Sequence, residues 1–245
     1  MKKALLVAGV LCATAFGIEP ANLLAARSYL LFKAGHDRQA VALAKKACKE
    51  KDVIGCREIG AFYSKIYRSH KSNAYIMAST IYNSLVAEKK GCELHDPLAC
   101  KTYAETIQSF INNGLIAKIP QLVKGYQNPA IEGMLFGQCT DYYGEHACRE
   151  KTSHLISHAV PLYNSIRDPD YDKKIINYDL KLACYYAKEG FPKIKPLPSS
   201  ATKKEKDAYD YLVNVGKEKM KELVYRDGKC LWAYDINYPI GMFYW

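Results

Sequence analysis

The sequence has 245 residues, of which 49% are apolar and 24% charged, and its formal net charge is +10 at pH 7. A chain of this length and apolar content can bury a core and is not disordered by composition. Its Lys and Arg residues are spread along the chain without an RNA-binding or zinc-finger signature, which argues against a nucleic-acid partner.

Residues 1–17 have the pattern of a secretory signal peptide. Two lysines precede a short apolar run, and small residues two positions apart follow it. The run is shorter than the roughly 20 apolar residues that a membrane helix needs, and no later stretch reaches that length. A lipoprotein interpretation through Cys12 stays open, although the large Leu11 precedes it. We therefore expect a secreted or periplasmic protein with no transmembrane segment in its mature form.

Eight cysteines follow the signal segment, and their spacing is the clearest pattern in the chain: Cys48, Cys56, Cys92, Cys100, Cys139, Cys148, Cys184 and Cys230. An even number of cysteines in an exported chain predicts disulfides. The first three pairs join positions eight or nine apart, and the pairs recur at a period of about 45 residues, as in stacked repeats. The alternatives are free thiols or a metal site, but zinc sites favour shorter ligand spacing.

Small residues flank most of these cysteines, among them Ala47, Gly55, Gly91 and Ala99, while Gln138 departs from the pattern. Small neighbours let two backbones come close enough for a disulfide. Between the cysteines, apolar residues recur at the helical period, and Gly, Asn, Asp and Pro mark the turns.

These patterns predict an all-α fold, an α/α solenoid of stacked helix hairpins over residues 18–190. The first cysteine of each pair ends one hairpin and the second begins the next, so that disulfides join consecutive repeats. Residues 191–202 form a proline-rich connector. Residues 203–245 form a C-terminal helix that caps the array, followed by an aromatic tail. Thr202 is the N-cap residue of this helix, and a Cys184–Cys230 bridge ties the helix to the array.

The alternation Ala47-Cys48, Gly55-Cys56, Gly91-Cys92, Ala99-Cys100 resembles the Helicobacter cysteine-rich protein family, a disulfide-bearing branch of Sel-like repeats related to tetratricopeptide repeats. The resemblance covers about residues 21–190. The units here are longer than the usual family repeat, and the tail from Phe191 matches no pattern we recognise. The resemblance implies a secreted or periplasmic solenoid, with associations to penicillin binding, weak β-lactam hydrolysis and host or cell-wall interaction.

The residues themselves give little support to serine β-lactamase chemistry. Ser200 and Lys203 have the spacing of the first motif of these enzymes, but they lie in the proline-rich connector. The middle motif is absent, and Lys151-Thr152-Ser153, which resembles the third, precedes the first. We assign no catalytic residue, and we keep a β-lactamase or penicillin-binding hydrolase as the alternative function.

His154 and His158 lie four positions apart, on one face of a predicted helix, with His146 nearby. Without a catalytic Glu between them they lack the zincin arrangement. We interpret them as polar surface residues and expect neither a metal nor a cofactor.

The favoured hypothesis is a monomeric binding scaffold. A curved stack of helix pairs displays the first helix of each pair to an extended ligand. That ligand is a protein, a peptide or a peptidoglycan fragment. Tyrosine suits such a face because it carries an apolar ring with a polar end. The candidate binding residues are Tyr63, Tyr67, Tyr103, Tyr142 and Tyr143.

Overall fold

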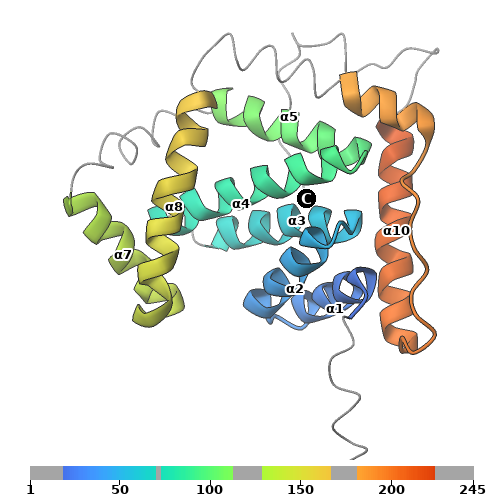
Figure 1. Cartoon of the computed structure of the whole chain (residues 1–245), viewed down its shortest axis with the longest axis horizontal. Coiled ribbons are helices and arrows are strands. Elements are labelled where there is room, and N and C mark those ends of the chain that lie inside the picture. Colours follow the sequence, from blue (N-terminus) through green and yellow to red (C-terminus); the bar gives the residue numbers. More distant parts are fainter. Residues whose placement is uncertain (1–18, 70–72, 113–128, 167–180, 224–245) are drawn as a thin grey trace, which may run out of the picture.

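Figure 1 shows the computed structural model, which describes residues 19–69, 73–112, 129–166 and 181–223. Every regular element in these ranges is a helix, as predicted. The labelled helices are α1 (Ala21–Lys33), α2 (Asp37–Lys49), α3 (Val53–Ser69), α4 (Ala74–Glu93), α5 (Pro97–Asn112), α7 (Pro129–Tyr143), α8 (Glu145–Ile166) and α10 (Lys203–Leu223), and residues 181–189 are also helical. None of the described helices has both the length and the apolar composition needed to cross a membrane. The predicted signal segment lies outside the described residues.

Consecutive helices pack against each other along the chain, so the fold is an α/α solenoid. α1 and α2 form the first hairpin, α3 and α4 the second, and α2 packs on α3 as α4 packs on α5. α7 and α8 pack together and both rest on α4, which α8 crosses in Figure 1. One apolar core runs through these units, from Ala40 in α2 to Ala159 in α8.

The turns between hairpins repeat the same backbone structure. Lys51 and His95 each lie three residues after a cysteine and adopt positive φ angles of 67° and 65°. The next residue is an aspartate in both turns, and its amide donates back to the helix that has just ended, Asp52 to Ala47 and Asp96 to the carbonyl of residue 91. The Asp52 carboxylate then accepts from the Gly55 amide at 2.7 Å, which caps the helix that follows.

Two disulfides join the helices on either side of these turns, and each depends on a glycine. Cys48–Cys56 and Cys92–Cys100 hold their Cα atoms 4.6 and 4.4 Å apart. A Cβ atom on Gly55 would lie 2.5 Å from the Cβ of Ala47, and one on Gly91 would lie 2.6 Å from the Cβ of Ala99. One member of each flanking pair therefore has to be glycine for the helices to come this close.

The third bridge, Cys139–Cys148, is wider, with a Cα–Cα distance of 5.7 Å. Gln138 occupies the position that carries Ala47 and Gly91 in the earlier bridges, so a close helix approach is not available here. Its side chain accepts from the Tyr75 amide at 3.1 Å, and its carbonyl accepts from the Asn73 side chain at 3.0 Å. Gln138 thus ties α7 to the beginning of α4.

The remaining cysteine of the described chain, Cys184, is also disulfide-bonded. Its predicted partner, Cys230, lies outside the described residues. The Cys92–Cys100 bridge packs against Ala183 and Leu182 of the helical residues 181–189. The three bridges with both cysteines among the described residues indicate an oxidising environment.

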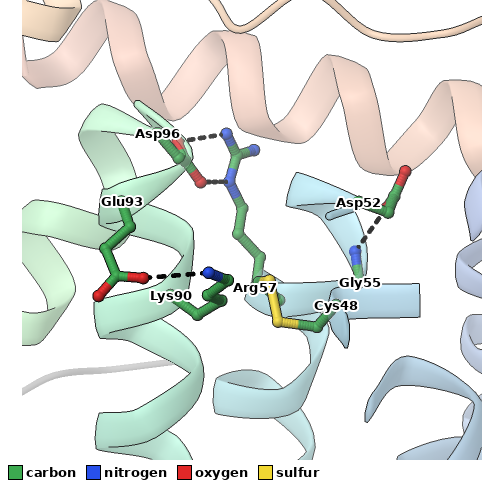
Figure 2. The surroundings of a disulfide bond; sticks show 8 residues. Cys48, Asp52, Gly55, Arg57, Lys90, Glu93 and Asp96 are labelled. Carbon is green, nitrogen blue, oxygen red and sulfur yellow. Dashed lines mark hydrogen bonds and ion pairs between the residues drawn. A yellow bond between two sulfur atoms is a disulfide. The ribbon is translucent and has the colours of Figure 1, made fainter. Parts of the chain in front are cut away.

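A buried ion pair connects the first and second inter-repeat turns. The Arg57 guanidinium donates to both carboxylate oxygens of Asp96, with Nε–Oδ2 and Nη2–Oδ1 distances of 2.5 and 2.7 Å (Figure 2). Asp96 is fully buried, and the ring of Phe191 lies 4.9 Å from the guanidinium carbon. Separating the two partners would leave each charge buried and unpaired, which is strongly destabilising. The ion pair therefore holds the two turns in place relative to each other.

The C-terminal segment, residues 181–223, runs back along the side of the molecule that carries these two turns (Figure 1). The sequence predicts a helix that caps the array, and in the structure α10 packs against α1 and α5. The connector makes this return possible, because ten extended residues reach roughly 30 Å. The Asn22 side chain holds it in place by donating to the carbonyls of Lys195 and Pro196 at 3.0 and 2.8 Å.

The beginning of α10 agrees with the sequence prediction. The Thr202 amide donates to the Glu205 carboxylate at 2.7 Å, and the Glu205 amide donates to the Thr202 hydroxyl at 3.3 Å. These reciprocal bonds form a capping box. Glu205 also binds Arg27 of α1 at 2.6 Å, which lowers the pKa of Glu205 and secures the helix to the first repeat.

Candidate ligand-binding site

Basic side chains from two separate helices gather over α4. We call this group the cationic cluster, and its members are Arg38 and Lys45 of α2 and Lys151, His154 and His158 of α8. α4 packs against both α2 and α8, and it contributes Tyr82 and Asn83 to the site. All five cationic residues are exposed to solvent.

Lys45 is the best-defined member of the cluster. Its Nζ atom donates to Asn83 Oδ1 at 2.6 Å and lies 5.3 Å from the centre of the Tyr63 ring. Part of the side chain is exposed, but the ammonium group is enclosed by these neighbours. Desolvation, followed by repulsion from Lys151, lowers the pKa of Lys45 to about 8.

Tyr143, at the end of α7, lies beneath cations from both sides of the site. The Lys151 ammonium is 4.8 Å and the Arg38 guanidinium carbon 5.4 Å from its ring centre. Its ring also meets Tyr75 of α4 edge-on, at 6.3 Å. Cation–π contacts of this kind stabilise an arrangement in which two positive side chains approach one ring.

The two histidines stack on each other with ring centres 4.2 Å apart, and His154 also meets the edge of Tyr82 at 6.2 Å. Desolvation lowers the pKa of His154, and the charges of His158 and Lys45 lower it further. Neutral His154 is therefore favoured around neutral pH unless an anion approaches. No group of three or more His, Cys, Asp or Glu side chains suited to a metal ion occurs in the described ranges.

Ser157 lies beside His158 but does not form a catalytic pair with it. Nδ1 of His158 is 2.7 Å from the Ser157 hydroxyl and 3.0 Å from the His154 carbonyl oxygen. A carbonyl oxygen can only accept, so Nδ1 carries a proton in that bond and cannot act as a base toward the serine. This Ser–His pair therefore lacks the geometry of an activated nucleophile.

The β-lactamase-like motifs are not brought together by the fold. Ser200 precedes α10, whereas Lys151-Thr152-Ser153 lies within α8, on the opposite side of the molecule (Figure 1). Thr152 is buried in α8 with 2% of its surface exposed. These residues therefore cannot contact one substrate in this structure.

The candidate tyrosines divide into three groups. Tyr63 and Tyr103 are core residues, 4% and 5% exposed, which corrects their assignment to an exposed binding face. Tyr63 follows Cys56 by seven positions and Tyr103 follows Cys100 by three, so both share the helix face of a buried cysteine. Tyr143 belongs to the site described above. The side chains of Tyr67 and Tyr142 lie outside the described residues.

No pattern in the sequence predicts Arg38, Lys45 or Lys151 as site residues. Nothing local marks them, because lysine and arginine occur all along this basic chain. The spacing of His154 and His158 did predict a shared helix face. The cations of α2 lie near these histidines only because α2 and α8 both pack against α4.

Comparison with known proteins gives no match to this chain among family models, curated proteins or solved structures. The resemblance to the Helicobacter cysteine-rich proteins therefore rests on the cysteine spacing and on the residues that flank it.

Proposed function

We propose that the chain is an exported helical-repeat scaffold that binds a protein, peptide or cell-wall ligand through the cationic cluster. The observation that carries the proposal is that Lys45 and Lys151 lie close enough to repel each other while neither forms an ion pair with a described carboxylate. A site that holds like charges together is well suited to an anionic group of a ligand.

The rest of the fold supports this function by keeping the site rigid. The disulfide-joined turns and the return of α10 to α1 limit the movement of one hairpin relative to the next. A preformed surface binds at a lower entropic cost than one that orders on binding.

Export is proposed from two features. The N-terminal residues have the pattern of a signal peptide, and the disulfides suit a secreted or periplasmic protein. We also infer membership of the Helicobacter cysteine-rich family, for which the cysteine spacing and flanking residues are the support.

The test uses the oxidised, full-length mature chain and a panel of immobilised peptides and soluble peptidoglycan fragments. The variant Lys45→Ala/Lys151→Ala removes the two ammonium groups. The control Lys46→Ala/Arg149→Ala makes the same change in charge on the same two helices, at exposed residues for which no contact with the cluster is described.

We expect at least one class of probe to bind the wild-type chain and the control, and to lose affinity for the first variant. Equal binding of every probe by both variants would contradict the proposal. Turnover of nitrocefin by the wild-type chain, lost in Ser200→Ala, would instead support the hydrolase alternative.

A further inference from the structure

Several cations of the cluster repel one another. Lys45 faces Lys151, and His154 faces His158, Lys45 and Lys151, while the Glu150 carboxylate acts on His154 in the opposite sense. The side chains that α4 and α7 present here, Tyr82, Asn83 and Tyr143, are uncharged. The free protein therefore holds Lys45, Lys151 and His154 where their positive charges repel, and neither lysine forms an ion pair with a described carboxylate.

The positions of these cations also indicate how the negative charges of a ligand would be spaced. The cations come from α2 on one side and from α8 on the other, with α4 between them. Lys45 is held in place by Asn83 at 2.6 Å, and Lys151 is held over the Tyr143 ring at 4.8 Å. A ligand with several carboxylates along an extended chain can meet cations of both helices at once.

The aromatic rings favour a peptide over a sugar polymer. Sugars bind proteins by stacking on open aromatic faces, but Lys151 and Arg38 both lie over the Tyr143 ring. Tyr63 is 4% exposed and lies under Lys45, and Tyr82 is half-buried against His154. The rings of this site thus hold the cations in place. A ligand would therefore interact with the cations through charge and hydrogen bonds and would not stack on the rings.

We propose that the ligand of the cationic cluster is an acidic peptide segment, whose carboxylates lie between Lys45 and Lys151 and beside His154. This inference rests on the proposed function and narrows its ligand to one chemical class. It also predicts a proton-linked affinity, because a bound carboxylate favours the charged form of Lys45.

The binding experiment uses rhodamine-labelled decapeptides of alternating Glu and Ser, with Gln-Ser decapeptides as uncharged controls. Fluorescence anisotropy with the oxidised full chain measures the affinity. We expect the Glu peptide to bind at least roughly tenfold more tightly than the Gln peptide, and Lys45→Ala/Lys151→Ala to lose roughly ten- to hundredfold in affinity. Lys46→Ala/Arg149→Ala should bind as the wild-type chain does.

The pH dependence tests the role of Lys45 separately. One pH unit above a pKa of about 8, about nine-tenths of the free ammonium is deprotonated, so the affinity should fall roughly tenfold between pH 7 and 9. This range lies above the titration of His154, whose pKa is lowered. Lys45→Arg keeps its charge throughout and should bind with little change over the same range.

Equal binding of the Glu and Gln peptides, or an unchanged affinity of Lys45→Ala/Lys151→Ala for the Glu peptide, would overturn the inference. Peptidoglycan fragments or phosphatidylglycerol vesicles are tested with the same variants. The wild-type chain could bind one of these probes but not the Glu peptide, and the double variant could lose affinity for that probe. In that case the acidic-peptide proposal is wrong, while ligand binding at the cationic cluster still holds. If no probe distinguishes the double variant from its control, both proposals fail.

Discussion

Gly91→Ala should destabilise the protein because α4 and α5 are held too close together to admit one more methyl group. The new Cβ would lie 2.6 Å from the Cβ of Ala99 and 3.6 Å from that of Cys56. Carbon atoms in contact normally lie about 3.5–4.0 Å apart. The Cys92–Cys100 bridge, with its Cα–Cα distance of 4.4 Å, prevents the helices from separating by the required distance of about 1 Å.

The expected size of the effect follows from two opposing terms. Overpacking of a tight core costs about 1–3 kcal/mol. Replacing a helical glycine by alanine returns about 1 kcal/mol through helix propensity, so Gly91→Ala should cost up to about 2 kcal/mol. Ala99→Gly loses the same propensity and should cost about 1 kcal/mol.

The exchange Gly91→Ala/Ala99→Gly is the decisive variant. It moves the methyl group to the other helix and gives the second bridge the arrangement of the first, where Ala47 faces Gly55. The propensity terms cancel and the clash disappears, so the double variant should be close to wild type, with a coupling energy of about 1–3 kcal/mol. Denaturant unfolding of the oxidised chain, followed by circular dichroism, measures all three. A double variant as unstable as the sum of the singles would refute the reasoning.

Three further perturbations test other parts of the fold. Replacing Cys48 and Cys56 by alanine opens a ring of about nine residues and should cost about 2–3 kcal/mol in denaturant unfolding; an unchanged stability would contradict this. Gly216→Ala would place a Cβ 2.0 Å from Nη1 of Arg57, so we expect α10 to detach, seen as early proteolysis of the C-terminal segment while the repeats stay intact. Burial raises the pKa of Glu88 from its ordinary 4.5 to about 8. Because the folded value is the higher one, the stability that Glu88 contributes should be greatest below about pH 4.5 and be lost as the pH rises to about 8, and Glu88→Gln should remove this part of the pH dependence when unfolding is measured across the range.

The parts of the fold that the sequence predicts are those with a local signal. The cysteine pairs, the small residues around them and the Thr202 cap all act over fewer than ten positions. Asp52 and Asp96 recur at one offset, and the structure gives the reason, since both follow a residue with positive φ at the same place in the inter-repeat turn.

What the sequence does not predict depends on contacts between distant segments. A helix at the end of the chain is expected to stack on its nearest neighbour. The packing of Tyr209, Leu212 and Val213 against apolar residues of α1, together with the Glu205–Arg27 ion pair, draws it to the first repeat instead. The cationic cluster is hidden for the same reason. Arg38 and Lys151 meet over Tyr143 because α7 and α8 both rest on α4.

The return of α10 to α1 has a consequence for how the chain reaches its native state. In an open array each repeat is completed by its neighbours, and folding can spread along the chain as synthesis proceeds. Here Leu24, Ala25 and Ala26 of the first helix are covered by residues near Tyr209, so the earliest repeat stays unfinished until almost the last residues are available. Closing so large a loop is slow. The molecule therefore gains its final stability in one late step that joins α10 to α1.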